Sequence, residues 1–283
     1  MSSNSGDNIS PTAHYTGEVW RRAGLSHPWL GTREGRIMVD ALHPLMVVSG
    51  ALGGPSLESY LLARHRAIDA LLTDAVERHG VSQVIEIAAG MSARGWRFAN
   101  RYGDAITYVE ADLPAMAERK RRALARIGSL SDGHRMAEID ARRDEGPRSL
   151  AQLAASLDPG AGLAIVTEGL LGYLATDAVL ALWRRIATAL ATFSSGRYIS
   201  DLHLGSVQTP VVRLFRQLLA GFVRGQVYLH FDRATEAEAA LREAGFAAAT
   251  VRRAGAIIEL PEREQRSTAH ILEASTTDSE RRP

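Results

Sequence analysis

The pattern of hydrophobic positions divides the chain into a first part that is helical and a longer part in which strands and helices alternate. From about residue 12 to Gly80 no segment has the short apolar run or the two-residue alternation of a strand. The clearest helix is predicted over 57–79, with one apolar stripe formed by Leu57, Leu61, Ile68, Leu72 and Val76. Gly80 follows it, as is common at helix ends.

After Gly80, short apolar runs alternate with helical segments. The predicted strands are Gln83–Ile87, Ala105–Val109, Arg135–Ile139, Ala161–Val166, Arg197–Leu202, Ala247–Val251 and Thr268–Leu272. The predicted helices are Leu113–Ile127, Thr176–Leu190, Pro210–Gly221 and Thr235–Ala244, the last with a capping box of Thr235 and Glu238. This alternation predicts an α/β fold with a mostly parallel sheet, covered on both faces, that binds ligands at the carboxyl ends of its strands.

We expect three parts along the chain: a helical lid or substrate segment over 1–56, the main domain over 57–275 and a disordered tail over 276–283. The first segment carries the apolar side chains Tyr15, Trp20, Trp29 and Met38. A lid of this kind excludes water from a reacting centre. The alternative is a simple helical cap on the sheet edge. The stretch 205–231 is a second candidate wall of the substrate site.

Composition narrows the class of protein. The chain has 283 residues, of which 46% are hydrophobic and 23% are charged, as in a soluble globular protein. Its 33 Lys and Arg nearly balance 32 Asp and Glu, so the chain lacks the excess of positive charge with which proteins bind nucleic acid non-specifically. The absence of cysteine excludes disulfides, zinc–thiolate sites and cysteine nucleophiles. Without an apolar run of about 18 residues or a signal-peptide core, the protein is expected in the cytoplasm, with no membrane partner.

The loop after the first strand carries candidate cofactor chemistry. Ala88, Ala89 and Gly90 leave room for a ligand to approach the backbone, and Asp112 ends the second strand about 20 residues later, where an acid can bind ribose hydroxyls. A dinucleotide site would need further glycines to cradle a pyrophosphate, and here only Gly95 follows. The pattern therefore favours S-adenosylmethionine over a nicotinamide dinucleotide. The structural alternatives are an ordinary turn at Gly90 and a helix N-cap at Asp112.

Charged residues on the helices give two further expectations. Arg64 lies on the apolar stripe of the first predicted helix, so it needs an anion, either an internal carboxylate such as Asp69 or Glu86 or the carboxylate of a methionine moiety. The cluster of His65, Arg66 and Asp69 is expected to be exposed or to support the site. The basic run 119–122 is expected to be the solvated face of its helix, with Met116, Leu124 and Ile127 turned inward and no role in nucleic-acid binding.

Four motifs occur in order along the chain. They are Arg64-His-Arg66-Ala-Ile-Asp69, Ala88-Ala-Gly90-Met-Ser-Ala-Arg94, Glu110-Ala-Asp112-Leu-Pro114 with Lys120, and Glu168-Gly-Leu-Leu-Gly-Tyr173-Leu. Together they resemble the leucine carboxyl methyltransferase family, in its bacterial polyketide-type branch. The resemblance covers about residues 60–175, and His14–Leu25 is similar as well. It implies a Rossmann-like class I methyltransferase fold with a seven-stranded sheet, and S-adenosylmethionine as cofactor.

The resemblance also implies roles for single residues. Arg64 would hold the cofactor's carboxylate, Glu168 would bind its amino group, and Ala88 to Gly90 would pass beneath its methionine part. Asp112 would bind the ribose, and Asp140 and Ala141 would flank the adenine. Tyr173 would lie near the transferred methyl group. Glu86, on the strand before the loop, is included among the cofactor-binding candidates. Ala88 replaces a family glycine and is expected to be harmless because it keeps the loop small. Ala141 replaces a family leucine, which makes the adenine position the least secure.

The nucleophile decides whether a base is needed. A carboxylate is ionised at pH 7, since its reference pKa is about 4, whereas a phenol with a reference pKa of about 10 needs a base such as histidine. His203, just past the fifth predicted strand, is the candidate base and, with Tyr173, the candidate catalytic pair. The other histidines considered are His14, His27, His43 and His230, and each also fits a structural or surface role.

The sequence therefore predicts an S-adenosylmethionine-dependent O-methyltransferase of secondary metabolism. It would form a methyl ester on a small natural-product-like or peptide acceptor, without a metal, as a monomer or homodimer. Three alternatives stay open: a hydroxyl O-methyltransferase with a histidine base, a nicotinamide-dependent oxidoreductase, and a non-catalytic binding protein that has kept the fold.

Overall fold

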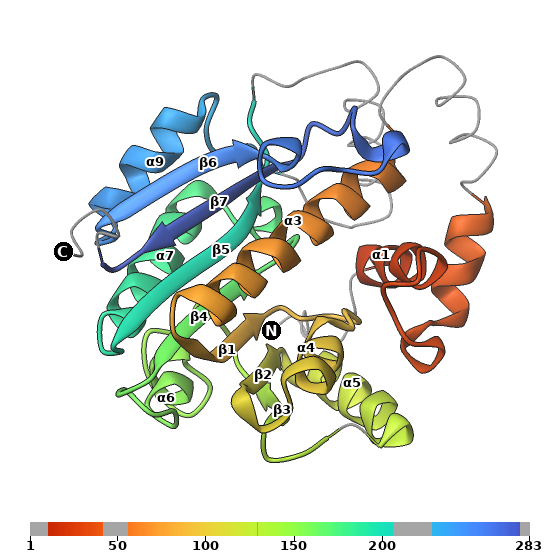
Figure 1. Cartoon of the computed structure of the whole chain (residues 1–283), viewed down its shortest axis with the longest axis horizontal. Helices are drawn as coiled ribbons and strands as arrows, with labels where there is room; N and C mark the ends of the chain where they lie inside the picture. Colours follow the sequence, from red (N-terminus) through yellow and green to blue (C-terminus); the bar gives the residue numbers. More distant parts are fainter. Residues whose placement is uncertain (1–10, 42–55, 129, 206–227, 278–283) are drawn as a thin grey trace, which may run out of the picture.

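Seven strands form one mixed sheet in the computed structural model, which describes residues 11–41, 56–128, 130–205 and 228–277 (Figure 1). The strands are β1 (Val81–Ile87), β2 (Thr107–Asp112), β3 (His134–Glu138), β4 (Gly162–Thr167), β5 (Ser195–Leu202), β6 (Ala248–Arg253) and β7 (His270–Ser275). Their order is β3-β2-β1-β4-β5-β7-β6, and β7 is antiparallel to both of its neighbours. The predicted seven-stranded, mostly parallel sheet is confirmed. The second strand begins later than predicted because Gly103–Ala105 forms a short 3-10 helix.

Four of the predicted helices are confirmed to within a residue at each end, and the described part of the chain contains further helices. The helices are α1 (Pro11–Arg22), α3 (Leu57–Arg78), α4 (Arg94–Tyr102), α5 (Pro114–Ile127), α6 (Leu150–Ala154), α7 (Thr176–Leu190) and α9 (Ala234–Glu243), and residues 33–41 are also helical. The predicted helix Pro210–Gly221 lies outside the described residues. None of the helices in the described part of the chain is long and apolar enough to cross a bilayer.

Both faces of the sheet are covered, which confirms the predicted layers (Figure 1). On one face α3 and α4 pack through Ile68, Leu72 and Phe98 against β-strand side chains such as Val84. On the other face α6, α7 and α9 pack around the fully buried Trp183. Apolar side chains on both faces are the pattern of a parallel sheet buried in the middle of its domain.

The strand order reverses between β1 and β4, which lie side by side in the centre of the sheet. In open α/β sheets this reversal leaves a crevice outside the carboxyl ends of the strands, because the connections from the two strands leave in opposite directions. The segment that follows β1 carries Ala88, Ala89 and Gly90, referred to below as the glycine loop, and the segment that follows β4 carries Glu168. The fold thus brings together two of the motifs singled out in the sequence.

The N-terminal helix packs on the main domain. Tyr15, Val19 and Trp20 of α1 form a small core with Leu57 and Leu61 of α3. Trp29, by contrast, is 55% exposed. The division at residue 56 and the lid function of 1–56 stay predictions, and most of the tail 276–283 lies outside the described residues.

The capping box predicted for the last helix is wrong. The helix α9 begins at Ala234, so Thr235 lies inside its first turn, where its hydroxyl cannot act as an N-cap. Glu236 instead accepts hydrogen bonds from the backbone N–H of Asp232 at 3.1 Å and of Arg233 at 3.3 Å. Glu238 accepts one from the backbone N–H of Val251 at 2.8 Å and thereby fixes α9 to β6.

Candidate active site

Five neighbouring strands place predicted site residues at one edge of the sheet. Gly90 follows β1, Asp112 ends β2, Asp140 lies two residues beyond β3, Glu168 follows β4 and His203 follows β5. Because the five strands are parallel, their carboxyl ends meet at the same edge. The residues chosen from the sequence therefore share one region of the molecule, although their individual roles stay predictions.

The loop after β1 has an unusual backbone. Gly90 has φ +51°, and Ala88 has φ +54°, the one described non-glycine residue with a positive φ. An alanine in this left-handed region costs about 1–2 kcal/mol, because its Cβ crowds the following carbonyl. Ala88 therefore carries a conformational cost that the sequence did not indicate, while its effect on cofactor binding stays a prediction. Strain of this kind is typical of functional loops.

Asp112 holds the loop by its carboxylate. Its Oδ2 accepts a hydrogen bond from the N–H of Gly90 at 2.8 Å, and its Oδ1 accepts one from the N–H of Leu113 at 2.7 Å. Burial raises the pKa of Asp112, although both backbone donors oppose the shift. The N-cap of α5 is Leu113, so the alternative interpretation of Asp112 as an N-cap is wrong. Each carboxylate oxygen still has acceptor capacity for a ligand hydroxyl.

Arg64 is paired inside the protein with two carboxylates that were not predicted as its partners, Glu168 and Asp201. Its Nε donates to Glu168 Oε1 and its Nη1 to Asp201 Oδ2, both at 3.0 Å. The predicted internal partners, Asp69 and Glu86, bind another arginine. Burial opposes ionisation of Arg64, but Asp201 and Glu168 raise its pKa above the usual range. The Nη2 atom of Arg64 is outside these two pairs and lies next to Gly169, where a Cβ added to the glycine would be 3.1 Å from it.

Glu168 is the point at which three basic side chains meet. Besides Arg64, it binds Arg94 Nη2 at 2.5 Å and lies 2.8 Å from His65 Nδ1, both through Oε2. Its side chain is 3% exposed. Burial alone would raise the pKa of Glu168, but its basic neighbours hold that pKa well below the usual range. The carboxylate is thus ionised at neutral pH.

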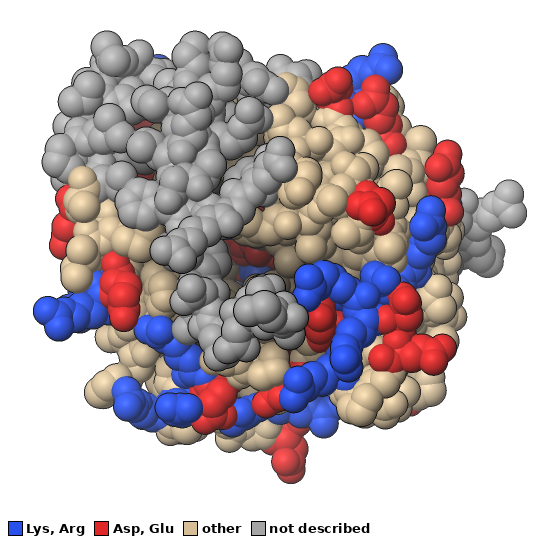
Figure 2. Space-filling model, turned by 180° about the vertical axis from the view of Figure 1, so that it is seen from behind, with Lys and Arg blue, Asp and Glu red and all other residues tan. Residues whose placement is uncertain are grey.

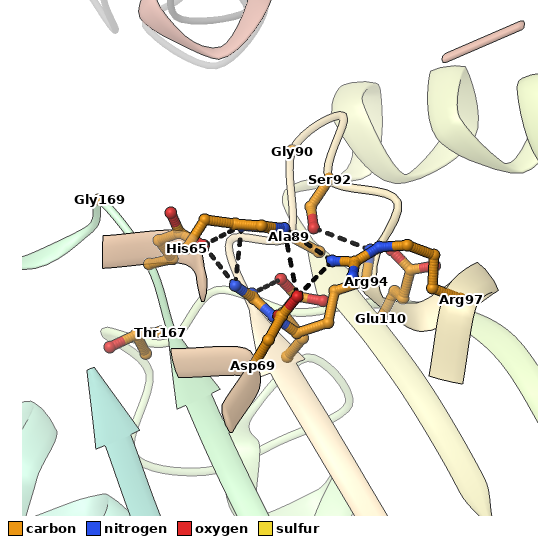
Figure 3. Close-up of polar contacts among 12 residues, drawn as sticks. His65, Asp69, Ala89, Gly90, Ser92, Arg94, Arg97, Glu110, Thr167 and Gly169 are labelled. Carbon is orange, nitrogen blue, oxygen red and sulfur yellow. Dashed lines mark hydrogen bonds and ion pairs between the residues drawn. The ribbon is translucent and has the colours of Figure 1, made fainter. Parts of the chain in front are cut away.

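Arg94 is the main site residue that the sequence analysis missed (Figure 3). The fully buried guanidinium donates from Nε to Asp69 and from Nη1 to Glu86, each at 2.6 Å, in addition to Glu168. The second oxygen of Glu86 accepts the hydroxyl of Tyr108 at 2.8 Å. Glu86 is therefore engaged in holding Arg94. Arg94 stands in the glycine-loop motif, but the sequence offered no signal that this arginine, among the three of α4, is buried.

The cluster after Arg64 is buried only in part, because Arg66 and Asp69 are half-buried. His65 is fully buried, with its Nε2 2.7 Å from Arg97 Nη2 and its ring 4.5 Å from that of Trp20. Arg97 also donates to Asp69 at 2.6 Å (Figure 3). The helix α1 and the loop side of α4 cover this face of α3, which the helical pattern alone could not indicate. His65 and Asp69 thus support Glu168 and Arg94, whereas Arg66 pairs with Glu264.

His203 forms a pair with Tyr60, a residue that the sequence analysis did not select. The Tyr60 hydroxyl lies 3.0 Å from His203 Nε2, and Arg64 lies over the Tyr60 ring at 5.9 Å. Burial lowers the pKa of His203, so its imidazole is neutral at pH 7. Tyr173, in the 3-10 helix Leu171–Tyr173, is 37% exposed at the same edge of the sheet.

The other described histidines have local structural partners. His14 Nδ1 lies 3.0 Å from the Thr32 hydroxyl, and His27 accepts the N–H of Trp29 at 3.2 Å. His230 bridges the Thr176 hydroxyl and the Leu171 carbonyl. His43 lies outside the described residues. The role of His203 as the histidine that meets an acceptor stays a prediction.

Asp140 and Ala141 lie beside Asp112, since the N–H of Ile139 donates to the Asp112 carbonyl at 2.9 Å. The Asp140 carboxylate accepts the backbone N–H of Arg142 at 3.1 Å and its Nε at 3.0 Å, and its side chain is 25% exposed. This position suits the predicted contact with an adenine. That contact stays a prediction.

The arrangement of charged and metal-ligating side chains bears on two other kinds of site. No three His, Cys, Asp or Glu side chains among them are grouped so as to hold a metal ion. On the face seen in Figure 2, Lys and Arg side chains lie among Asp and Glu side chains rather than in a continuous basic surface.

Comparison with known proteins places this site in a family. The sequence matches the family model described as leucine carboxyl methyltransferase over residues 37–187. A protein of Mycolicibacterium gilvum, provisionally named as an S-adenosyl-L-methionine-dependent methyltransferase, is 36% identical over 118 residues, 42% of this chain and 37% of its own length. A protein of Rhodococcus jostii with the same provisional name is 35% identical over 144 residues, 49% of this chain and 47% of its own length. The matches thus span less than half of these relatives.

A solved structure supports the fold. A protein from Thermobifida fusca, provisionally assigned as a methyltransferase, superposes with a TM-score of 0.65 at 14% sequence identity and covers 96% of both chains. At this identity the likeness concerns the fold alone. It confirms the predicted Rossmann-like class I fold. The matched residues 37–187 contain all four motifs on which the resemblance rested, and they make up more than half of the chain. The chain belongs to the leucine carboxyl methyltransferase family.

Proposed function

We propose that the protein is an S-adenosylmethionine-dependent O-methyltransferase that forms a methyl ester on a small natural-product-like or peptide acceptor. The family match, the names of its relatives and the class I fold support a methyltransferase. They also bear out the predicted cofactor, S-adenosylmethionine. The acceptor and the ester product are our inference from the resemblance to carboxyl methyltransferases.

The observation that carries the choice of cofactor is the occupation of the loop amides. The N–H of Gly90 donates to Asp112 and the N–H of Ala89 to the Ala111 carbonyl. A dinucleotide fold needs such amides free to bind a pyrophosphate. This loop therefore favours a cofactor without phosphate over a nicotinamide dinucleotide.

The charges at the site agree with this choice. Three arginines (Arg64, Arg94 and Arg97) face four carboxylates (Asp69, Glu86, Glu168 and Asp201). The cluster has more carboxylates than guanidinium groups, which suits a cationic sulfonium and disfavours a pyrophosphate. When bound, S-adenosylmethionine supplies a methyl group that is electrophilic because it is attached to this sulfonium.

The residues at the edge of the sheet fit the parts of this cofactor. Arg64 would bind its carboxylate through Nη2, the nitrogen outside the two internal pairs, and Glu168 would meet its amino group. Asp112 would accept ribose hydroxyls while it holds Gly90. Asp140 and Ala141 would flank the adenine. Each assignment uses a group whose charge or acceptor capacity is complementary to the part that it binds.

The acceptor side needs positioning more than acid–base chemistry. Methyl transfer from a sulfonium is an in-line displacement, and an acceptor carboxylate is already ionised at neutral pH. Tyr173 and the Tyr60–His203 pair would orient it by hydrogen bonds. A neutral His203 can serve as a donor without taking up a proton.

A second candidate is methylation of a hydroxyl, and the Tyr60–His203 pair is the observation that favours it. Because burial lowers the pKa of His203, this imidazole is neutral at pH 7 and one of its ring nitrogens can accept a proton as a base. The two candidates differ in what they require of His203. A carboxylate acceptor requires only orientation, whereas a phenol or alcohol requires proton removal.

The experiment combines labelled cofactor with panels of acceptors. The protein is incubated with methyl-labelled S-adenosylmethionine and matched carboxylic acids and phenols, and the products are treated with alkali. Label that is released as methanol identifies a methyl ester, as we expect, whereas alkali-stable label identifies an ether. Binding of the cofactor without transfer to any acceptor would support the non-catalytic alternative.

The variant His203→Gln separates the two candidates by mechanism. An ester-forming enzyme should keep its rate within a few-fold and show a flat pH–rate profile near neutrality. An enzyme that uses His203 as general base should lose about 10²–10⁴-fold in kcat. Tyr60→Phe serves as the matched control, because it removes the partner hydroxyl but keeps the imidazole.

A further inference from the structure

The turn after β1 is held from beneath by a lysine that the sequence pattern assigned to solvent. Lys120 lies on α5 in the basic run 119–122, yet its side chain is fully buried and its Nζ donates to the Ala89 carbonyl at 3.3 Å. The expectation of a solvated face is therefore wrong for this residue. The short 3-10 helix Pro28–Leu30 and strands β2 and β3 pack on α5 and enclose it.

Lys120 is part of a buried charged cluster. Its Nζ contacts the carboxylate of Glu110 on β2, and the other oxygen of Glu110 lies 2.6 Å from His134 Nε2 on β3. All three side chains are fully buried. Gly95 makes room for them, since a Cβ there would lie 2.5 Å from Glu110 Oε1. The cluster therefore requires a residue without a Cβ in the first turn of α4, and Gly95 meets this requirement.

Stability alone does not account for a cluster of this kind. Burying a lysine and a glutamate is costly, and apolar replacements of such pairs are often neutral or stabilising. Burial lowers the pKa of Lys120 to about 7. What distinguishes Lys120 from an ordinary buried pair is its second contact, to the Ala89 carbonyl in the strained turn after β1.

That contact completes a clamp on one peptide group. The Ala89 carbonyl and the Gly90 N–H belong to the same peptide plane; Lys120 and the N–H of Ser92 bind its oxygen, while Asp112 binds its N–H. The plane lies between two residues with positive φ, Ala88 and Gly90. Rotation of this plane would turn a carbonyl oxygen to the side now occupied by the N–H. All three hydrogen bonds oppose that rotation.

We propose that Lys120 is a positioning residue that fixes the Ala89–Gly90 peptide plane beneath the methionine part of the cofactor. The proposal rests on the proposed use of S-adenosylmethionine. It assigns to Glu110 and His134 the supporting task of holding the ammonium group in place. Lys120 itself does not touch the cofactor.

The test compares Lys120→Met with the wild type in two measurements. Titration with S-adenosylhomocysteine should show about tenfold weaker binding, the loss typical of one charged hydrogen bond. Hydrogen exchange should become faster at the Gly90 and Ser92 amides and stay unchanged in β5. The control Leu241→Ala removes a buried side chain from α9, which packs on the edge strand β6, away from β1 in the order of the strands. It should lower stability yet leave the affinity and the exchange of the loop amides unchanged.

Wild-type affinity and wild-type exchange in Lys120→Met would overturn the clamp. If that variant does not fold, the double variant Lys120→Met/Glu110→Gln removes both charges, keeps an acceptor for His134 and should show the same tenfold loss. Wild-type affinity in the double variant would equally overturn it. If the wild type itself does not bind S-adenosylhomocysteine, the proposed cofactor fails, while the exchange of the loop amides still tests the clamp.

Discussion

At the scale of single residues, Glu168 holds the site together, because it balances Arg64, Arg94 and His65 at once. Glu168→Gln keeps the shape but removes the charge, and it leaves two buried guanidinium groups short of an anion. We expect the free energy of unfolding to fall by about 3–5 kcal/mol, as when one partner of a buried pair is removed. Urea denaturation measures the change.

The matched control is Glu118→Gln. Glu118 also pairs with two arginines, Arg121 and Arg122, but on the surface of α5. Exposed pairs contribute little to stability, so this variant should unfold like the wild type. Equal effects of the two substitutions would contradict the importance of the buried network.

The same carboxylate predicts how stability depends on pH. The folded pKa of Glu168 lies below its unfolded value of about 4.3, so its contribution is fully present above that value and is lost as the pH falls below it. The free energy of unfolding of the wild type should therefore decrease as the pH is lowered from about 5. In Glu168→Gln this part of the decrease should be missing. Parallel pH profiles for the two proteins would refute the assignment.

Ala88 predicts a stabilising substitution. Ala88→Gly relieves the positive φ, worth about 1–2 kcal/mol, and loses about 0.5–1 kcal/mol to the greater freedom of the unfolded chain. We expect a net gain of about 0.5–1 kcal/mol in thermal or urea unfolding. Ala89→Gly is the control, since Ala89 has no positive φ and its buried methyl is lost. A destabilised Ala88→Gly would show that the turn is not strained.

The residue scale also marks the limit of prediction from sequence. The motif positions of Arg64, Asp112 and Glu168 were identified, and the structure places all three at the same edge of the sheet. Their partners were not, because Arg64 and Asp201 are 137 residues apart and meet through the order of the strands. Arg94 and Lys120 were missed because each lies among other basic residues on its helix, where spacing does not reveal which of them is buried.

At the scale of elements, the helix α3 delivers Tyr60, Arg64, His65 and Asp69 to the site. Ser56 is its N-cap, with its side chain accepting the N–H of Ser59 at 3.0 Å. Ser56→Ala should lower the free energy of unfolding by about 1 kcal/mol, whereas Ser56→Asp keeps the cap and should be nearly neutral. Chemical denaturation of both variants measures this. Equal losses would show that the side-chain cap does not matter.

Elements with a strong hydrophobic period were predicted well, and their ends less so. The helix Thr176–Leu190 matches its prediction because Val179, Trp183, Ile186 and Leu190 define one buried face. The start of β2 and the cap of α9 were misplaced because several adjacent residues could serve each role. In α9, both Glu236 and Glu238 are near enough to the first turn to be capping candidates. Glu236 accepts the N–H of Arg233, whereas Glu238 accepts the N–H of Val251 on β6.

At the scale of the whole molecule, the order of the strands assembles the site. Seven strands were predicted, but their order follows from crossovers that no local pattern specifies. The reversal between β1 and β4 brings the glycine loop next to Glu168, and β5 adds Asp201 and His203. Family membership supplies this arrangement in advance, which explains why motif positions predicted the location of the site better than the periodicity did.

The most direct test of the central claim is calorimetric titration of the wild-type protein with S-adenosylhomocysteine, with NADH titrated in parallel. We expect one site per chain with a micromolar dissociation constant for S-adenosylhomocysteine and no heat from NADH, because the loop amides are already occupied. Absence of binding by S-adenosylhomocysteine, or binding of NADH in its place, would contradict this claim.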